Sequence, residues 1–151
     1  MNSAVIQIAD GIVQAINSGP GYSQPVTAVR SYRARFELRD LGALKVVVVP
    51  ATWQLEPFDR THDGLTIRTD IGVLKKLTSA EGTPELQAEM DGLCQLVSEI
   101  AQRLRRRRLE IALEHSWVGL AMEPVFEPEA FVQRREFISI LQVTYRVRSS
   151  A

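Results

Sequence analysis

The chain has 151 residues, 45% of them hydrophobic, and its 18 basic and 18 acidic residues give a formal net charge of zero. A chain of this length and composition is expected to form a single domain, 1–151, whose core needs neither disulfides nor a metal. The charge balance argues against free nucleic-acid binding driven by bulk charge. Cys94 is the only cysteine, which excludes an internal disulfide and fits a reducing compartment. No apolar run approaches the roughly 20 residues of a membrane span, and residues 1–9 lack the basic start of a signal peptide.

Two amphipathic helices are predicted. The first covers residues 3–17, with Ser3 as its N-cap. The second covers residues 83–108; Thr83 can cap its start, and Pro84 suits the first helical position. Its apolar side chains recur at steps of three and four residues, which places them on one face. They are Leu86, Met90, Leu93, Val97, Ile100 and Leu104.

Five strands are predicted beside these helices. They span residues 26–38, 44–49, 65–74, 117–122 and 137–148. The first two lie close together in sequence, which favours an antiparallel pair. The second is apolar throughout, which is typical of a strand covered on both faces, and Pro50 is expected to end it. Residues 51–64 are then expected to form a surface loop, and residues 129–135 a short helical turn.

The order of these elements predicts an α+β fold. The simplest arrangement is a mainly antiparallel sheet of four to five strands with the two principal helices packed on one face. Val97 and Ile100 are expected to be buried against that sheet. The opposite face should be partly polar, exposed in a monomer or covered in an oligomer. It would carry Arg33, Arg35, Arg68, Asp70 and Arg146.

No familiar catalytic motif is present. The chain lacks a glycine-rich phosphate loop, a Gly-x-Ser-x-Gly elbow and a cysteine pair. The densest set of possible metal ligands is Glu56, Asp59, His62 and Asp63. Asp59 and His62 could share one turn, but this composition is also typical of a solvated connection. Cys94 is expected to be a small buried hydrophobe rather than a nucleophile.

Arginine dominates the basic residues, with fifteen arginines against three lysines. This bias indicates either a protein interface, where the planar guanidinium is favoured, or a GC-rich genome. The run 105–108 would compensate a helix dipole or bridge to acidic groups of a neighbouring subunit. Glu123, Glu127 and Glu129 are expected to form an exposed acidic turn rather than an acid–base pair, because prolines lie between them. The candidate interface residues are Arg33, Arg35, Arg68, Arg105, Arg107, Glu123 and Glu127.

Several stretches together resemble the tail-terminator and tail-completion (head–tail neck) proteins of long-tailed bacteriophages and prophages. The first are a short helix at residues 6–17 and the arginine-rich strand 27–36, TAVRSYRARF. The next are the apolar strand 44–50, LKVVVVP, and residues 68–76, RTDIGVLKK, which precede a helix. The last are residues 123–128, EPVFEP, which run into residues 135–145, REFISILQVTY. The resemblance covers nearly the whole chain and lies in its organisation and local phrases.

The resemblance implies a non-enzymatic virion subunit without cofactors. Such proteins form a ring, commonly a hexamer, at the head-proximal end of the tail, where they stop tail-tube polymerisation and meet the neck. The implied partners are further copies of the chain, the tail tube protein, a neck or head-completion protein, and genomic DNA that passes through the channel without sequence reading. No membrane is involved, and the ring would be assembled in the bacterial cytoplasm.

Three alternatives stay open. They are a head–tail joining (neck or stopper) protein, a cytoplasmic assembly chaperone absent from the particle, and a small ligand- or metal-binding enzyme domain that uses residues 56–63.

Overall fold

A computed structural model describes residues 3–32, 42–57 and 59–149. The elements follow the order predicted from the sequence, two helices and five strands with a short helical turn before the last strand. They are α1 (Ala4–Asn17), β1 (Ala28–Arg30), β2 (Lys45–Pro57), β3 (Asp63–Lys76), α2 (Pro84–Leu104), β4 (His115–Met122), the π-helical turn η2 (Ala130–Arg134) and β5 (Glu136–Ser149). None of the described helices is long and apolar enough to cross a membrane.

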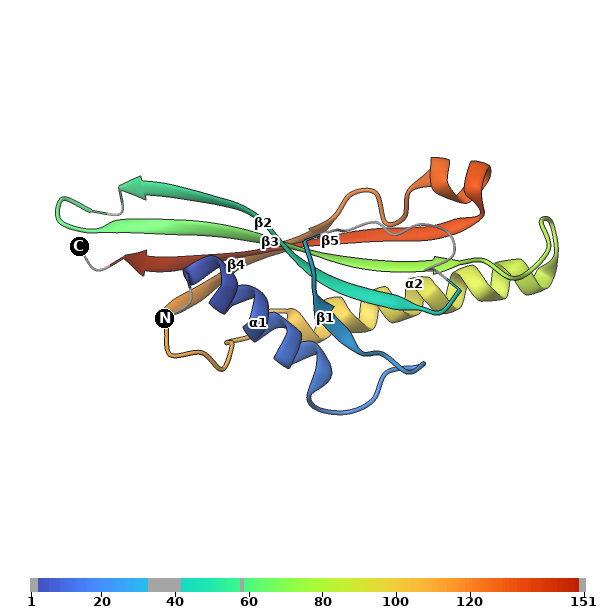
Figure 1. Cartoon of the computed structure of the whole chain (residues 1–151), viewed down its shortest axis with the longest axis horizontal. Helices are drawn as coiled ribbons and strands as arrows, with labels where there is room; N and C mark the ends of the chain where they lie inside the picture. Colours follow the sequence, from blue (N-terminus) through green and yellow to red (C-terminus); the bar gives the residue numbers. More distant parts are fainter. Residues whose placement is uncertain (1–2, 33–41, 58, 150–151) are drawn as a thin grey trace.

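The strands form one sheet in the order β1-β2-β3-β5-β4. Every pair is antiparallel except β1–β2, so the predicted α+β fold with a mainly antiparallel sheet is confirmed. Figure 1 shows α1 and α2 on the same side of the sheet, and the β2–β3 hairpin projects past them at one end. We call the side covered by the helices the helix face and the opposite side the outer face.

The helix face holds the main core. α1 begins at Ser3, whose hydroxyl accepts the N–H of Ile6 at 3.4 Å, and α2 begins at Thr83, whose hydroxyl accepts the N–H of Leu86 at 3.2 Å. Both predicted N-caps are therefore confirmed. The predicted burial is also confirmed, because Val97 and Ile100 are fully buried. They belong to one apolar cluster with Ile67, Ile71, Leu141 and Val143.

The first half of β2 is buried on both faces, as its apolar run predicts. Val46 and Val48 join the helix-face cluster. Val47 lies on the outer face in a smaller cluster with Leu74, Ala130 and Ile138. That cluster includes a residue of η2, so the turn covers one end of the outer face. The other end of the outer face carries the polar residues discussed below.

The predicted antiparallel pairing of the first two strands is wrong. β1 pairs with β2 in parallel, with Ala28 opposite Val46 and Arg30 opposite Val48. A parallel pair needs a connection of about a dozen residues or more, and residues 31–44 supply that length. Sequence proximity alone favoured a hairpin. The expected strand 26–38 reaches only from Ala28 to Arg30 in the described part of the chain, and residues 33–38 lie outside it.

The predicted surface loop at 51–64 is also wrong. β2 continues through Pro50 to Pro57 and pairs with β3 down to Asp63. The register shifts between Pro50 and Thr52, as in a β-bulge. Proline is tolerated in a strand at a bulge or on an edge, and here both conditions hold.

The second helix ends earlier than predicted, at Leu104 instead of Arg108. Arg106 adopts a left-handed conformation with φ of 52°, which turns the chain out of the helix. The turn lets Leu109 enter the core, where it is 2% exposed and lies against α1. A Cβ on Gly11 would stand only 3.1 Å from Leu109 Cβ, so glycine permits this close approach.

Candidate assembly surface

Trp53, the aromatic residue of β2, is exposed at the projecting end of the sheet. Trp53 lies opposite Ile67, and Leu55 lies opposite Leu65, so all four side chains are on the helix face. The helices do not extend over this end (Figure 1), and Trp53 is 59% and Leu55 is 52% exposed. A large exposed apolar pair on a rigid strand is typical of an interaction surface, where tryptophan is a frequent anchor.

The outer face of the same end is rich in arginine. Arg68 points there, as predicted, and Arg146 and Arg148 lie on the same face of β5. Arg68 Nε lies 3.3 Å from Asp70 Oδ1, but without hydrogen-bond geometry, so both atoms lack a hydrogen-bond partner among the described residues. Burial raises the pKa of Asp70, although the Arg68 guanidinium opposes this effect. This end therefore has an apolar face and a polar face that carries charges of both signs.

The carboxylate of Asp59 holds the turn of the β2–β3 hairpin. It accepts the N–H groups of Thr61 and His62 at 2.8 Å each, and the His62 Nδ1 lies 3.0 Å away. Hydrogen bonds from the Thr61 backbone, and then from the His62 side chain, lower the pKa of Asp59 below its usual range. Arg148 Nη2 lies 3.7 Å from the same carboxylate. Asp59 and His62 are thus close together, but their contacts are those of a turn.

The four possible metal ligands of residues 56–63 do not converge. Glu56 lies in β2 and accepts the hydroxyl of Thr66 at 2.9 Å, whereas Asp63 begins β3. Across the described ranges, no group of three histidine, cysteine, aspartate or glutamate side chains is placed to hold a metal ion.

The five predicted interface residues that the structure describes lie on different parts of the molecule. Arg68 is on the outer face, whereas Arg105 and Arg107 follow α2 on the helix side, and the Arg107 carbonyl accepts the hydroxyl of Tyr145. Glu123 and Glu127 follow β4 in the connection to η2, and the Glu127 N–H donates to Ile138 O at 2.8 Å. The remaining two, Arg33 and Arg35, lie outside the described residues.

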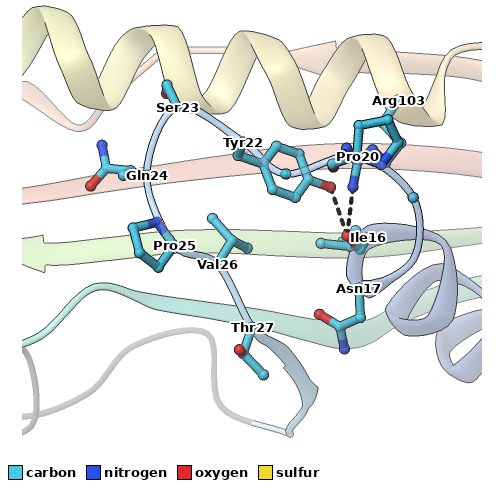
Figure 2. Close-up of a pocket in the computed structure, with 12 residues that line it drawn as sticks. Ile16, Asn17, Pro20, Tyr22, Ser23, Gln24, Pro25, Val26, Thr27 and Arg103 are labelled. Atoms are coloured by element: carbon cyan, nitrogen blue, oxygen red, sulfur yellow. Dashed lines mark hydrogen bonds between the residues drawn. The ribbon is translucent and has the colours of Figure 1, made fainter.

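Arg103 clamps the end of α1 instead of serving as a surface charge. Its Nη1 donates to Ile16 O at 3.0 Å and Ser18 O at 2.9 Å, and its Nη2 donates to Pro20 O. The guanidinium also stacks on Tyr22, 3.9 Å from the ring centroid, while the Tyr22 hydroxyl donates to Ile16 O at 2.8 Å. Figure 2 shows Arg103 and Tyr22 pointing together at Ile16. An open hollow of about 410 Å³ lies beside them. Arg103 and Tyr22 line it, but their donors are already bonded to backbone carbonyls at the end of α1 and in the loop that follows.

A second hollow of about 580 Å³ lies beside the N-terminal half of α2. Met90, Cys94, Phe126 and Phe131 supply its apolar lining. Burial, and then the charge of Asp91, raise the pKa of Cys94, which keeps the thiol protonated and poorly nucleophilic. Cys94 packs against the core as a small hydrophobe, but it is only partly buried, not buried as predicted.

The sequence signal for the exposed apolar pair lies in the alternation of residues 52–56. Polar residues at positions 52, 54 and 56 alternate with Trp53 and Leu55, the period-two pattern of a strand. Pro50 and Pro57, which flank these residues, favoured a loop instead.

The sequence matches no protein-family model and no curated protein. Function is therefore inferred from the surface of the molecule and from the resemblance described above.

Proposed function

We propose that this protein is a structural subunit of a long-tailed phage particle. Copies of the chain assemble as a ring, six on the pattern of the family it resembles, at the head-proximal end of the tail. The ring ends polymerisation of the tail tube and provides the contact with the neck, and genomic DNA passes through it without sequence reading. The protein is not an enzyme.

One observation carries this proposal, namely the exposure of Trp53 and Leu55 on the projecting end of the sheet. Full burial of such a side chain is worth about 1.5–3 kcal/mol, so a folded chain that leaves both half exposed retains considerable binding free energy. The two residues belong to a hydrogen-bonded ladder between β2 and β3, so little conformational entropy is lost when a partner covers them. A subunit built to be covered by another protein has these properties.

The test of the function is deletion of the gene from the phage or prophage that encodes it. We expect overlong or irregular tails in electron micrographs, with normal tails restored by the wild-type gene. Tails of normal length that fail to join heads would identify a joining protein and contradict the terminator role. Mass spectrometry of purified particles should find the protein, and its absence would favour an assembly chaperone.

The test of the surface is the double substitution Trp53→Ser with Leu55→Ser in the complementing gene. Both side chains are exposed, so the melting temperature should stay unchanged while complementation is lost. Val132→Ser is the matched control, because Val132 is an exposed apolar residue on η2, away from the hairpin. Full complementation by the double variant would show that the exposed pair has no role in assembly.

A further inference from the structure

The sheet has two edges along which the described part of the chain provides no neighbouring strand. On one side, β1 pairs only with Val46–Val48, and none of the described residues pairs with residues 51–57 of β2 on that side. On the other side, β4 pairs with β5 and ends the sheet. Unpaired backbone N–H and C=O groups on such strands are templates for pairing with another chain.

Both edges are poor in charged side chains. Residues 51–57 contain one charged residue, Glu56, and β4 contains no aspartate, glutamate, lysine or arginine. His115 accepts the Leu109 N–H at its Nε2, at 2.9 Å, and its Nδ1 lies 2.7 Å from Leu113 O, as expected for a neutral ring. Edge strands of monomeric proteins are commonly protected by charges, lysine above all. Each edge has a bulge, and residues 51–57 also carry Glu56 and end at Pro57, but neither edge carries a lysine.

We infer that these two edges pair with each other between copies of the chain, so that β4 of one copy pairs with β2 of the next. This inference names the subunit contact of the ring and rests on the proposed function. The strand directions fix its geometry. β2 and β5 both run antiparallel to β3, and β4 runs antiparallel to β5, so β4 is antiparallel to β2. A neighbour that continues the sheet with the same face toward its helices therefore forms an antiparallel ladder with β4.

The charges next to the edges favour this unlike pairing over the two like ones. A hollow of about 190 Å³ at the start of β4 is lined by Glu114, His115, Ser116, Arg146 and Arg148. Glu56, the one charge on residues 51–57, lies on the outer face, as Arg146 and Arg148 do. Pairing β2 with β4 brings this carboxylate toward the arginines. Arg146 and Arg148 against the one carboxylate of Glu114 leave the β4 side with a net positive charge, so pairing β4 with β4 would bring like charges together. Pairing β2 with β2 would bring two glutamates together.

The apolar side chains at the two edges also lie on a common face. Trp53 and Leu55 of one copy would lie beside Trp117 and Leu120, which are on the helix face of β4. Val118, the bulged residue of β4, is 46% exposed and would be covered by the neighbour. A contact between two different surfaces of one molecule is heterologous, and it closes into a ring when the rotation between copies allows it.

The experiment uses two variants of the full chain, each blocked at one edge by lysines. One carries Thr52→Lys with Gln54→Lys on β2, and the other carries Val118→Lys with Ala121→Lys on β4; all four positions are exposed. Sedimentation velocity is measured at the concentration at which the wild-type chain is half associated. Each variant alone should be a monomer, and an equimolar mixture should give a 1:1 dimer and nothing larger, because each mixed pair retains one unblocked β2 edge and one unblocked β4 edge. The control, Ala88→Lys with Ser98→Lys on the exposed side of α2, should associate as the wild type does.

Three results would overturn the inference. Dimers formed by either blocked variant alone would show pairing between like edges. Wild-type association by both blocked variants would exclude the edges, and a wild-type chain that stays monomeric up to about 1 mM would exclude self-association through them. The outcome is independent of the deletion test. Paired edges with normal tails would refute only the proposed function, and overlong tails with unaffected edge variants would refute only this contact.

Discussion

Replacing Glu89 with glutamine should destabilise the protein at neutral pH and have little effect in acid. Glu89 projects from α2 toward the connection that follows β3. Its carboxylate accepts Lys75 Nζ at 3.0 Å, the Thr78 N–H at 3.2 Å and the Ser79 N–H at 3.1 Å, and its side chain is 11% exposed. One carboxylate thus joins the end of β3 to the helix that covers the sheet. Glutamine keeps the shape but cannot be an ionised acceptor for all these donors.

The magnitude follows from the pKa of Glu89. Burial by itself would raise this pKa, but the hydrogen bonds from Lys75 and from the Ser79 and Thr78 backbones outweigh it and lower the pKa to about 2, from an ordinary value of 4.5. At roughly 1.4 kcal/mol per pKa unit the full effect would be about 3 kcal/mol, and solvent screening at this partly accessible site reduces it to about 1–2 kcal/mol. A lowered folded-state pKa stabilises the protein above the unfolded value. The stabilisation is therefore complete above pH 4.5 and is lost as the pH falls toward 2.

The assay is urea-induced unfolding of the wild type and of Glu89→Gln, at pH 7 and at intervals down to about pH 3. The difference in the free energy of unfolding should be about 1–2 kcal/mol at pH 7 and should shrink through the acid range. Glu81→Gln is the control, because Glu81 is exposed in the loop before α2 and should cost less than about 0.5 kcal/mol. A difference no larger than that of the control at pH 7, or one that stays constant into acid, would refute the reasoning.

Three further predictions concern packing and the clamp at the end of α1. Ile100→Ala removes a fully buried side chain and should lower the free energy of unfolding by about 2–5 kcal/mol in urea titrations; a loss below about 1 kcal/mol would contradict its place in the core. Arg103→Leu should cost about 1.5–3 kcal/mol, since it removes charged donors to three carbonyls, while exposed Arg105→Leu should stay within about 0.5 kcal/mol; equal effects would mean that the clamp adds nothing. Tyr145→Phe should cost about 1–2 kcal/mol in the same assay, because the buried hydroxyl donates to the Arg107 carbonyl at 2.6 Å; a neutral result would show that water replaces the bond.

The helices were predictable where their signals are local. Ser3 and Thr83 cap their helices through hydrogen bonds to residues three positions later, and the apolar periodicity of α2 marks the buried side. The end of α2 was not predictable in the same way. The arginines after Leu104 have good helix propensity, and the chain leaves the helix because Leu109 is buried against α1. Gly11, a residue type of low helix propensity, is the site of that long-range contact.

The strand errors had a different origin. Pro50 predicts the end of a strand, but here it lies at a bulge on an edge strand, where a proline breaks no essential hydrogen bond. The parallel pairing of β1 with β2 is a property of topology, and no residue in either strand encodes it locally. The strands predicted at residues 65–74 and 137–148 were confirmed as β3 and β5, and one face of each is buried along most of its length.

Charged residues were the least predictable part of the surface. Composition and spacing do not distinguish Arg103, Asp59 and Glu89 from ordinary exposed charges. Their roles depend on backbone groups that the fold brings to them, such as the carbonyls at the end of α1 for Arg103. The arginine on the outer face, Arg68, was placed correctly because strand alternation alone decides its direction.

The different lengths of the two layers explain why this fold leaves an apolar surface uncovered. β3 and β5 have 14 residues each, which at about 3.3 Å per residue extend roughly 46 Å. α2 has 21 residues, which at about 1.5 Å per residue extend roughly 31 Å. The strands therefore exceed the longest helix by about 15 Å, or about four residues of strand, and Trp53 is among the side chains left uncovered on the helix face. Extending α2 beyond Leu104 toward this end would displace Leu109 from the core, and a second molecule can bury the uncovered side chains without that cost.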